Sequence, residues 1–264
     1  MGRWWTVWIC ACLLTGGCVG APFRGTADLP QKSEVRRERL VVHSNFEISA
    51  HHRLMDELVR LQDDVVKQLD LPKSESPIDV YLFETAAQYR KYIDTRLPEA
   101  PERRACFVHR NDELNVFAHW SEFVMVDLRH EVTHGYLHAV VDDLPLWLDE
   151  GLAEYFEVGR DAHGFNLSHR RLLQHRRVED DWRPDLAELE KVELPSAMGQ
   201  LHYAESWAWV HFLLETTPER RKLLRDYIAR LRMDGKQEEL SQLLLEHEPN
   251  AEVSLLKHLR SLQP

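Results

Sequence analysis

Cysteine is scarce in this chain of 264 residues, which contains only four. Cys10, Cys12 and Cys18 lie within the first 18 residues, so Cys106 alone remains for the folded body. A single cysteine cannot form an internal disulfide, and a disulfide-stabilised secreted scaffold is therefore excluded. Cys106 stands in the apolar stretch Ala-Cys-Phe-Val, which predicts a buried and unreactive side chain.

Basic residues are also in the minority, with 33 Lys and Arg against 44 Asp and Glu and a net charge of −11 at pH 7. Proteins that bind nucleic acid usually present a basic surface, so no nucleic-acid partner is expected. Hydrophobic residues make up 44% of the chain, which is enough to bury a substantial core. The composition is therefore that of a globular protein, and it does not indicate the oligomeric state.

Long hydrophobic runs are absent as well. The apolar run from Trp4 to Leu14 is too short to span a bilayer, but it follows Arg3 and precedes small residues, which is the layout of a secretory signal. This layout predicts export. An ordinary signal peptide without lipidation is one interpretation of it.

A second interpretation comes from Leu14-Thr15-Gly16-Gly17-Cys18, which resembles the lipobox of bacterial lipoproteins, although Thr15 stands where leucine is commonest. The resemblance implies a signal peptide over 1–17, lipidation of Cys18 and a tether over 18–34. It places the protein in the cell envelope as a membrane-anchored lipoprotein.

The body that follows, residues 35–264, reads as an α+β domain. Residues 35–140 predict an α/β lobe, because alternating apolar stretches at 39–48, 78–83 and 105–118 are interleaved with helical spacing. Residues 141–264 predict a mainly helical lobe. The expected helices lie at 50–70, 84–97, 128–138, 145–159, 203–215, 218–232, 237–246 and 252–262, and the basic stretch 169–177 reads as a solvated helix face.

The most specific motif is Arg-His-Glu-Val-Thr-His at 129–134. His130 and His134 are four residues apart on a predicted helix, so both imidazoles project from one face within reach of one ion. Glu131 lies between them, where it can act as a general base. A catalytic zinc ion normally has three protein ligands and one water molecule, so a third ligand is needed.

The stretch Pro-Leu-Trp-Leu-Asp-Glu-Gly-Leu-Ala-Glu-Tyr at 145–155 can supply that ligand. Pro145 can start a helix after a short turn, and Glu150 then faces His134. Glu154 follows one turn later on the same face. The alternative is that both segments are ordinary amphipathic helices in which the His and Glu residues have no role. This alternative explains the order and spacing of the two motifs less well than a metal site does.

Together the two motifs resemble the gluzincin metallopeptidases, which pair His-Glu-x-x-His on one helix with a Glu before Gly on the next. The resemblance implies a zincin-like fold with zinc between the two lobes, bound by His130, His134 and Glu150. It assigns Glu131 as the general base and Glu154 as the acidic residue that holds a ligand histidine. His138 departs from the spacing of the rival zincin pattern and is not expected to bind zinc.

Further expectations follow from the same resemblance. Tyr203, at the start of a predicted helix, matches the tyrosine that stabilises the oxyanion in such enzymes, and His202 is the alternative. The aminopeptidase signature Gly-x-Met-Glu-Asn is absent, which favours an endopeptidase acting on a peptide or protein substrate. The strand 113–119 is expected to be an exposed edge that pairs with the substrate backbone.

The sequence therefore predicts a zinc-dependent peptidase that hydrolyses peptide bonds with Glu131 as base. One alternative is a non-catalytic, zinc-binding envelope lipoprotein that acts as a scaffold or binding module. Another is an interaction module without metal. The intact Glu131 argues against the scaffold, because a scaffold has no need of a base.

Overall fold

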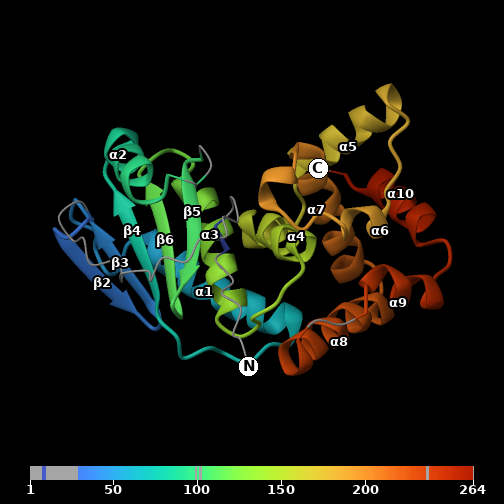
Figure 1. Cartoon of the computed structure of the whole chain (residues 1–264), viewed down its shortest axis with the longest axis horizontal. Helices are drawn as coiled ribbons and strands as arrows, with labels where there is room; N and C mark the ends of the chain where they lie inside the picture. The colour runs from blue at the N-terminus through green and yellow to red at the C-terminus, as the bar shows by residue number, and fades with distance from the viewer. Residues whose placement is uncertain (1–7, 10–28, 99, 101–102, 236–237, 264) are drawn as a thin grey trace. The chain divides into compact units, whose positions relative to one another are not determined.

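The computed structural model describes residues 8–9, 29–98, 100, 103–235 and 238–263 (Figure 1). Apart from Trp8–Ile9, the predicted signal, together with Cys18 and most of the predicted tether, lies outside the described residues. By contacts the chain divides into two compact units: residues 1–63 with 74–139, and residues 64–73 with 140–264. The fold combines one sheet with helices and is α+β, as the sequence predicts.

The first unit is built on a sheet with the strand order β1-β5-β6-β4-β3-β2. Strands β3, β4 and β6 are parallel neighbours, whereas β2 pairs antiparallel with β3 and β5 pairs antiparallel with β6. The two residues of β1 pair with β5. The bounds are β1 (Trp8–Ile9), β2 (Ser33–Arg37), β3 (Leu40–Ser44), β4 (Ile78–Phe83), β5 (Ala105–Arg110) and β6 (Glu113–His119).

The hairpin β5–β6 forms where the alternating pattern predicts it. Its turn residues Asn111 and Asp112 have φ angles of 53° and 64°. Two left-handed residues in succession give the type of two-residue turn whose twist matches that of paired strands, and Asn and Asp tolerate this conformation better than most residues. The turn sets the register, in which Cys106 lies opposite Phe117.

The expectation that strand 113–119 is an exposed edge is wrong. Strand β6 lies inside the sheet, where β5 and β4 pair with its two sides. Its backbone hydrogen bonds are therefore used within the sheet, and it cannot add a substrate strand. The burial of β6 agrees with this position, since its residues from Leu114 to Ala118 are all buried.

The start of the sheet also differs from the expectation. The predicted tether extends to residue 34, but β2 begins at Ser33 and pairs with β3 around a turn at Glu38, whose φ is 50°. The sequence of β2, Ser-Glu-Val-Arg-Arg, is mostly charged. Charged side chains are common on strands at the border of a sheet, and they conceal the apolar alternation that would reveal a strand.

Helices α2 (Ala86–Arg96) and α3 (Val124–His138) lie on opposite faces of this sheet. Cys106 and Val108 of β5 belong to an apolar cluster with Tyr92 of α2, whereas the intervening Phe107 stacks on rings of α3. The alternation follows from the two-residue period of a strand. Cys106 is fully buried, as its apolar surroundings predict.

Helix α1 (Arg53–Leu69) precedes β4, and Tyr136 of α3 donates a hydrogen bond to the backbone oxygen of Leu58 in α1 at 2.9 Å. Gly135 of α3 faces Ile78 of β4, where an added Cβ would lie 2.9 Å from the isoleucine side chain. Helix α3 is thus packed closely against its surroundings within the first unit.

The second unit is helical and is organised around α7 (Gln200–Glu215). Every residue of α7 from Ala204 to Leu214 is buried, and α4, α5, α6, α8 and α10 all pack against it. A helix that is buried on all sides lies at the centre of a helical unit. The other bounds are α4 (Leu146–Glu157), α5 (Leu167–Glu179), α6 (Leu186–Leu189), α8 (Pro218–Asp234), α9 (Leu240–His247) and α10 (Ala251–Ser261), with short 3₁₀ turns at Arg160–Ala162 and Pro195–Ala197.

Most helices lie where the periodicity predicts them. Helix α5 contains the basic stretch 169–177, which reads as a helix face, and extends over 13 residues from Leu167 to Glu179. Asn166 caps this helix, and its side chain accepts a hydrogen bond from the backbone N–H of His169. Among the described residues, no helix combines the length and the apolar character needed to cross a membrane.

Candidate metal centre

Helix α3 carries His130 and His134 one turn apart. Their side chains are 8% and 2% exposed, and their ring centroids lie 5.0 Å apart in an edge-on arrangement. The four-residue spacing places both rings on one side of the helix, as the sequence predicts. Two neighbouring buried imidazoles are a common part of a metal site.

The sheet holds one of these rings in place. Phe107 of β5 stacks on His134, with ring centroids 5.9 Å apart and an angle of 21° between the planes. Phe107 also stacks on His138, at 5.6 Å and 18°. The aromatic side chain therefore restricts the orientation of two histidines on α3, which reduces the conformational freedom that a bound metal would have to remove.

Helix α4 carries the acidic residues, and its segment from Leu146 to Phe156 is buried without interruption. Glu150 is 0% exposed. The residue after it, Gly151, faces α7 so closely that a Cβ atom would lie 2.6 Å from the backbone oxygen of Ser206. The glycine lets the two helix backbones approach each other, and this contact anchors the turn of α4 that carries Glu150.

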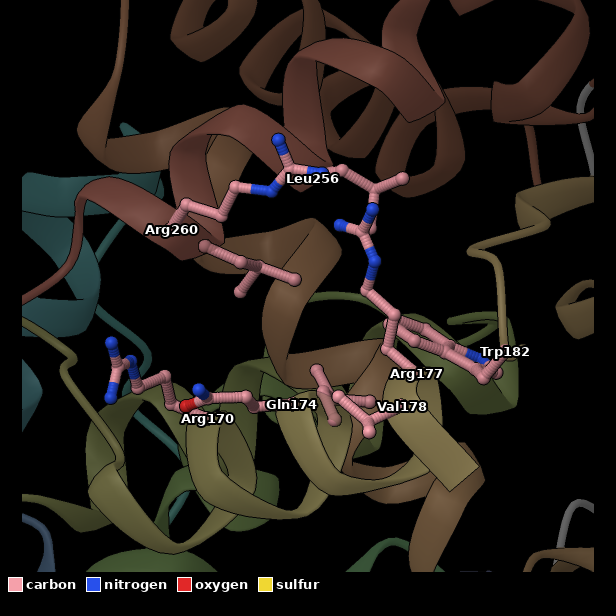
Figure 2. A pocket seen from close by; sticks show the side chains of 9 residues that line it. Arg170, Gln174, Arg177, Val178, Trp182, Leu256 and Arg260 are labelled. Atoms are coloured by element: carbon pink, nitrogen blue, oxygen red, sulfur yellow. The ribbon is translucent and has the colours of Figure 1, made fainter. Parts of the chain in front are cut away.

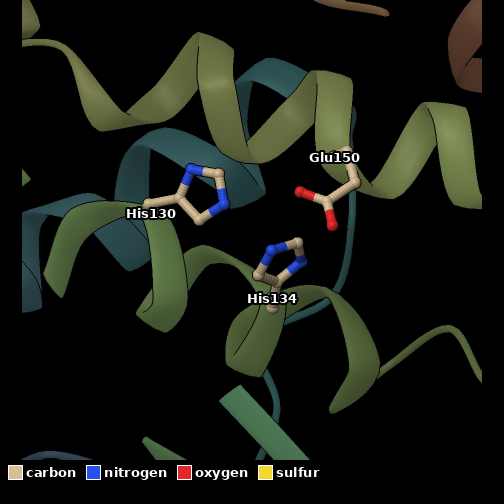
Figure 3. Close-up of side chains that lie close together, drawn as sticks. All are labelled: His130, His134 and Glu150. Carbon is tan, nitrogen blue, oxygen red and sulfur yellow. The ribbon is translucent and has the colours of Figure 1, made fainter. Parts of the chain in front are cut away.

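The side chains of His130, His134 and Glu150 point toward one another (Figure 3), and their ligand atoms all lie within 4.8 Å of one another. Two imidazole nitrogens and one carboxylate are the donor set of a catalytic zinc site with a position left for water. Both histidines contribute to this set, and the buried negative charge of Glu150 would be neutralised by a divalent cation. The residues present therefore fit zinc.

Two further groups of possible ligands share these histidines. His134 forms one with His138 and Asp149, and His130 forms the other with Glu154 and Glu157. Of the three groups found among the described residues, only that of His130, His134 and Glu150 uses both histidines. The sequence reasoning set His138 aside and did not consider Asp149, whose position next to Glu150 was the available signal.

Glu131, the expected base, is 5% exposed on α3. Within the described part of the chain it forms no ion pair, so its carboxylate is not neutralised by Lys or Arg. Its charge acts on its surroundings: burial raises the pKa of the Cys106 thiol to about 12, and the Glu131 carboxylate adds to this effect. Glu131 is thus a buried carboxylate close to the sheet.

Glu154 engages a histidine that sequence reasoning missed. Its Oε2 atom lies 2.6 Å from Nε2 of His169 on α5, and it also shares a group of possible ligands with His130. The His169 ring lies over Trp207 of α7, with centroids 5.9 Å apart. A carboxylate in this position can orient imidazoles. The link to His169 depends on how α5 packs, so no spacing in the sequence could reveal it.

Tyr203 lies in the first turn of α7 and is half-buried. It precedes Ser206 by three residues, which places it on the side of α7 that faces α4. His202, the alternative, is used differently: its Nδ1 accepts a hydrogen bond of 2.9 Å from the backbone N–H of Gly199 at the start of the helix. The structure therefore gives His202 a part in the start of α7, and the role of Tyr203 stays a prediction.

The fold and this cluster together define an α+β protein with a buried His-His-Glu group of metal-ligand type. Residues 125–232 match a family described as "Protein of unknown function (DUF1570)". The matched segment contains α4, α7 and all of α3 except Val124, and thus all of the residues discussed above as ligands, base and oxyanion donor. No curated protein matches the chain.

Proposed function

We propose that this protein is a zinc-dependent peptidase of the gluzincin type with a zincin-like fold. The observation that carries the proposal is the cluster of His130, His134 and Glu150, whose ligand atoms lie within 4.8 Å of one another. The cluster comes from two successive helices, in the order that the gluzincin resemblance requires. Glu131 adds a buried carboxylate next to the first ligand.

Zinc bound by these three residues would act as a Lewis acid on a peptide carbonyl and would lower the pKa of a water molecule toward neutrality. Glu131 accepts the proton of the attacking water and transfers it to the amine that leaves. The absence of a cationic partner on this carboxylate within the described residues keeps its lone pairs available for that proton.

Two other residues complete the proposed chemistry. The hydroxyl group of Tyr203 donates a hydrogen bond to the carbonyl oxygen as negative charge develops on it. Glu154 orients imidazole groups, since it lies beside His130 and contacts His169. The substrate is a peptide or protein, and the protein acts as an endopeptidase in the cell envelope, anchored through Cys18.

The test combines zinc content with hydrolysis of casein, for the wild-type chain and for Glu131→Gln. We expect about one zinc ion per chain in both, and loss of hydrolysis by at least about 100-fold in the variant, because the glutamine amide cannot accept the proton. Glu47→Gln, a change of the same kind at an acidic residue outside the cluster, is the control and should leave the rate unchanged.

The outcomes separate the proposed function from its alternatives. Zinc in both proteins with hydrolysis in neither would support a zinc-binding scaffold. A chain without zinc after purification and reconstitution would contradict the metal centre and favour an interaction module. Equal hydrolysis by wild type and Glu131→Gln would show that Glu131 is not the base.

A further inference from the structure

The second unit contains a pocket of about 240 Å³ between α5 and α10 (Figure 2). From α5 it is lined by residues at positions 170, 173, 174, 177 and 178, which share one face of the helix, and from α10 by positions 256, 259 and 260. Trp182 closes one side. The pocket is thus formed by two helical stripes, and none of its residues belongs to the candidate metal centre.

Three arginines give this pocket a positive charge. Figure 2 shows the side chains of Arg177 and Arg260 extending into the space between the two helices, while Arg170 lies two turns before Arg177 on the same face of α5. None of the three forms an ion pair with any described residue. The nearby acids Asp180 and Asp181 are engaged elsewhere, with Arg176 and Arg183.

This positive charge is unusual because the protein as a whole is acidic, with a net charge of −11. Arg160 and Arg220, for comparison, pair with Asp64 and Glu248. Like charges that line one pocket repel one another unless an anion neutralises them. The charge of the pocket is therefore complementary to an anionic group.

The remaining lining is apolar. Five of the nine lining residues are hydrophobic: Leu173, Val178, Trp182, Leu256 and Leu259. Leu173 forms a buried floor at 1% exposure, whereas Val178 is 75% exposed. An inorganic anion would leave this apolar surface in water, but a ligand with a hydrocarbon part would cover it.

We propose that this pocket binds an amphipathic anion, in which a carboxylate or phosphate monoester group is joined to an unbranched hydrocarbon chain. The head group lies against Arg177 and Arg260, and Arg guanidinium groups are well suited to bind carboxylate and phosphate. The chain lies along Leu173, Leu256 and Leu259. The lining of α5 from residue 170 to 178 is about 12 Å long, which suits a chain of medium length.

The test is calorimetric titration of the full chain with decanoate and with decyl phosphate, compared with decanol and inorganic phosphate. We expect both amphipathic anions to bind and both comparison compounds to bind at least about tenfold more weakly, because each lacks one of the two interactions. Raising the salt concentration should weaken binding of the anions.

The arginine double variant Arg177→Gln with Arg260→Gln should weaken binding of decanoate by about tenfold or more, since hydrogen bonds to charged groups are lost. The matched control is Arg171→Gln with Arg232→Gln, because these arginines are exposed on α5 and α8 and do not line the pocket. Circular dichroism checks that each variant is folded. Arg260→Gln alone, in the exposed last turn of α10, serves if the double variant unfolds.

Several outcomes would overturn the proposal. Equal weakening by the control would show unspecific electrostatic binding, and equally tight binding of decanol would show that the arginines are not used. Inorganic phosphate binding as tightly as decyl phosphate would exclude the role of the apolar lining. Binding only to phosphatidylcholine vesicles that contain phosphatidic acid, with none to free decanoate, would identify a membrane-contact surface in place of a ligand pocket.

Discussion

At the scale of single residues, the candidate metal centre contains more acids and imidazoles than one zinc ion needs. His130 and His134 each belong to two groups of possible ligands, and the acids that could complete a site include the neighbours Asp149 and Glu150. Burial does not distinguish these two acids, because both are buried. The choice depends on whether a single ion binds both histidines, and among the groups of described residues only the one with Glu150 contains both.

Replacing the two acids separately tests that choice. Glu150→Ala is expected to weaken zinc binding by more than about 100-fold, since one of three ligands is lost. Asp149→Ala, a truncation of the same kind one residue away, should leave zinc affinity within about tenfold of wild type. Zinc affinity is measured by competition with a chelator at pH 7. The reverse order of the two effects would assign the metal to the group of His134, His138 and Asp149.

At the scale of secondary-structure elements, the contact between α4 and α7 depends on one glycine. In most helices Gly→Ala stabilises a protein by up to about 1 kcal/mol, because alanine has the higher helix propensity. At Gly151 the added methyl group would lie 2.6 Å from the backbone oxygen of Ser206, and backbone atoms cannot move aside easily. The two helices would have to separate.

Gly151→Ala is therefore expected to lower the free energy of unfolding by about 1–3 kcal/mol, which is the usual cost of overpacking. Gly159→Ala is the control, because nothing lies within 4 Å of the position of its added Cβ. Denaturant unfolding of both variants and wild type measures the difference. If Gly151→Ala were as stable as Gly159→Ala, the close contact between α4 and α7 would be incorrect.

Strand β6 shows why elements are easier to predict than their neighbours. Its alternation and the turn at Asn111-Asp112 predict the hairpin with β5 correctly. Its other neighbour, β4, is a parallel partner that is distant in sequence, and no local pattern reports that pairing. For the same reason the sequence could not show that β6 lies inside the sheet.

At the scale of the whole molecule, stability should depend on pH through a pair of histidines, of which His211 is buried and His258 is partly buried. Nδ1 of His211 on α7 lies 2.8 Å from Nε2 of His258 on α10. Burial lowers the pKa of His211 to about 3 and that of His258 to about 4, with smaller contributions from the partner His258 and from Arg220, respectively. Both residues are therefore neutral in the folded protein at pH 5–7.

The unfolded chain takes up protons at these histidines as the pH falls below about 6.5, whereas the folded protein does so only near pH 3–4. The free energy of unfolding should therefore fall as the pH decreases from 6.5 to 4, by up to about 1.4 kcal/mol per pH unit for His211 alone. Above pH 7 this contribution is constant.

Urea unfolding at several pH values measures this dependence. A chelator is present at every pH, so that release of a bound metal at low pH does not contribute to the change in stability. The variant His211→Gln with His258→Gln should show a smaller loss of stability between pH 6.5 and 4.5 than wild type. Burial raises the pKa of Glu190 and of Glu205, so these two groups favour the folded protein as the pH falls. Their contribution is the same in wild type and in the variant, and it cancels when the two proteins are compared. An unchanged slope in the variant would show that this pair does not set the pH dependence.

The sequence by itself determined the α+β class, most of the helices and the residues His130, Glu131, His134 and Glu150 as a candidate site. These features depend on periodicity and on spacing within one helix or between two successive helices, which are local properties of the chain. The predicted signal and lipidation of Cys18 also stand on the sequence alone.

Only the tertiary structure decided the rest. It revealed the parallel pairing of β6 with β4, the contact of His169 with Glu154, the approach of α7 to Gly151 and the pocket that the basic face of α5 helps to line. Each of these joins residues that are far apart along the chain. Such contacts depend on which faces of the elements pack together, and side-chain packing between distant elements leaves no periodic signal in the sequence.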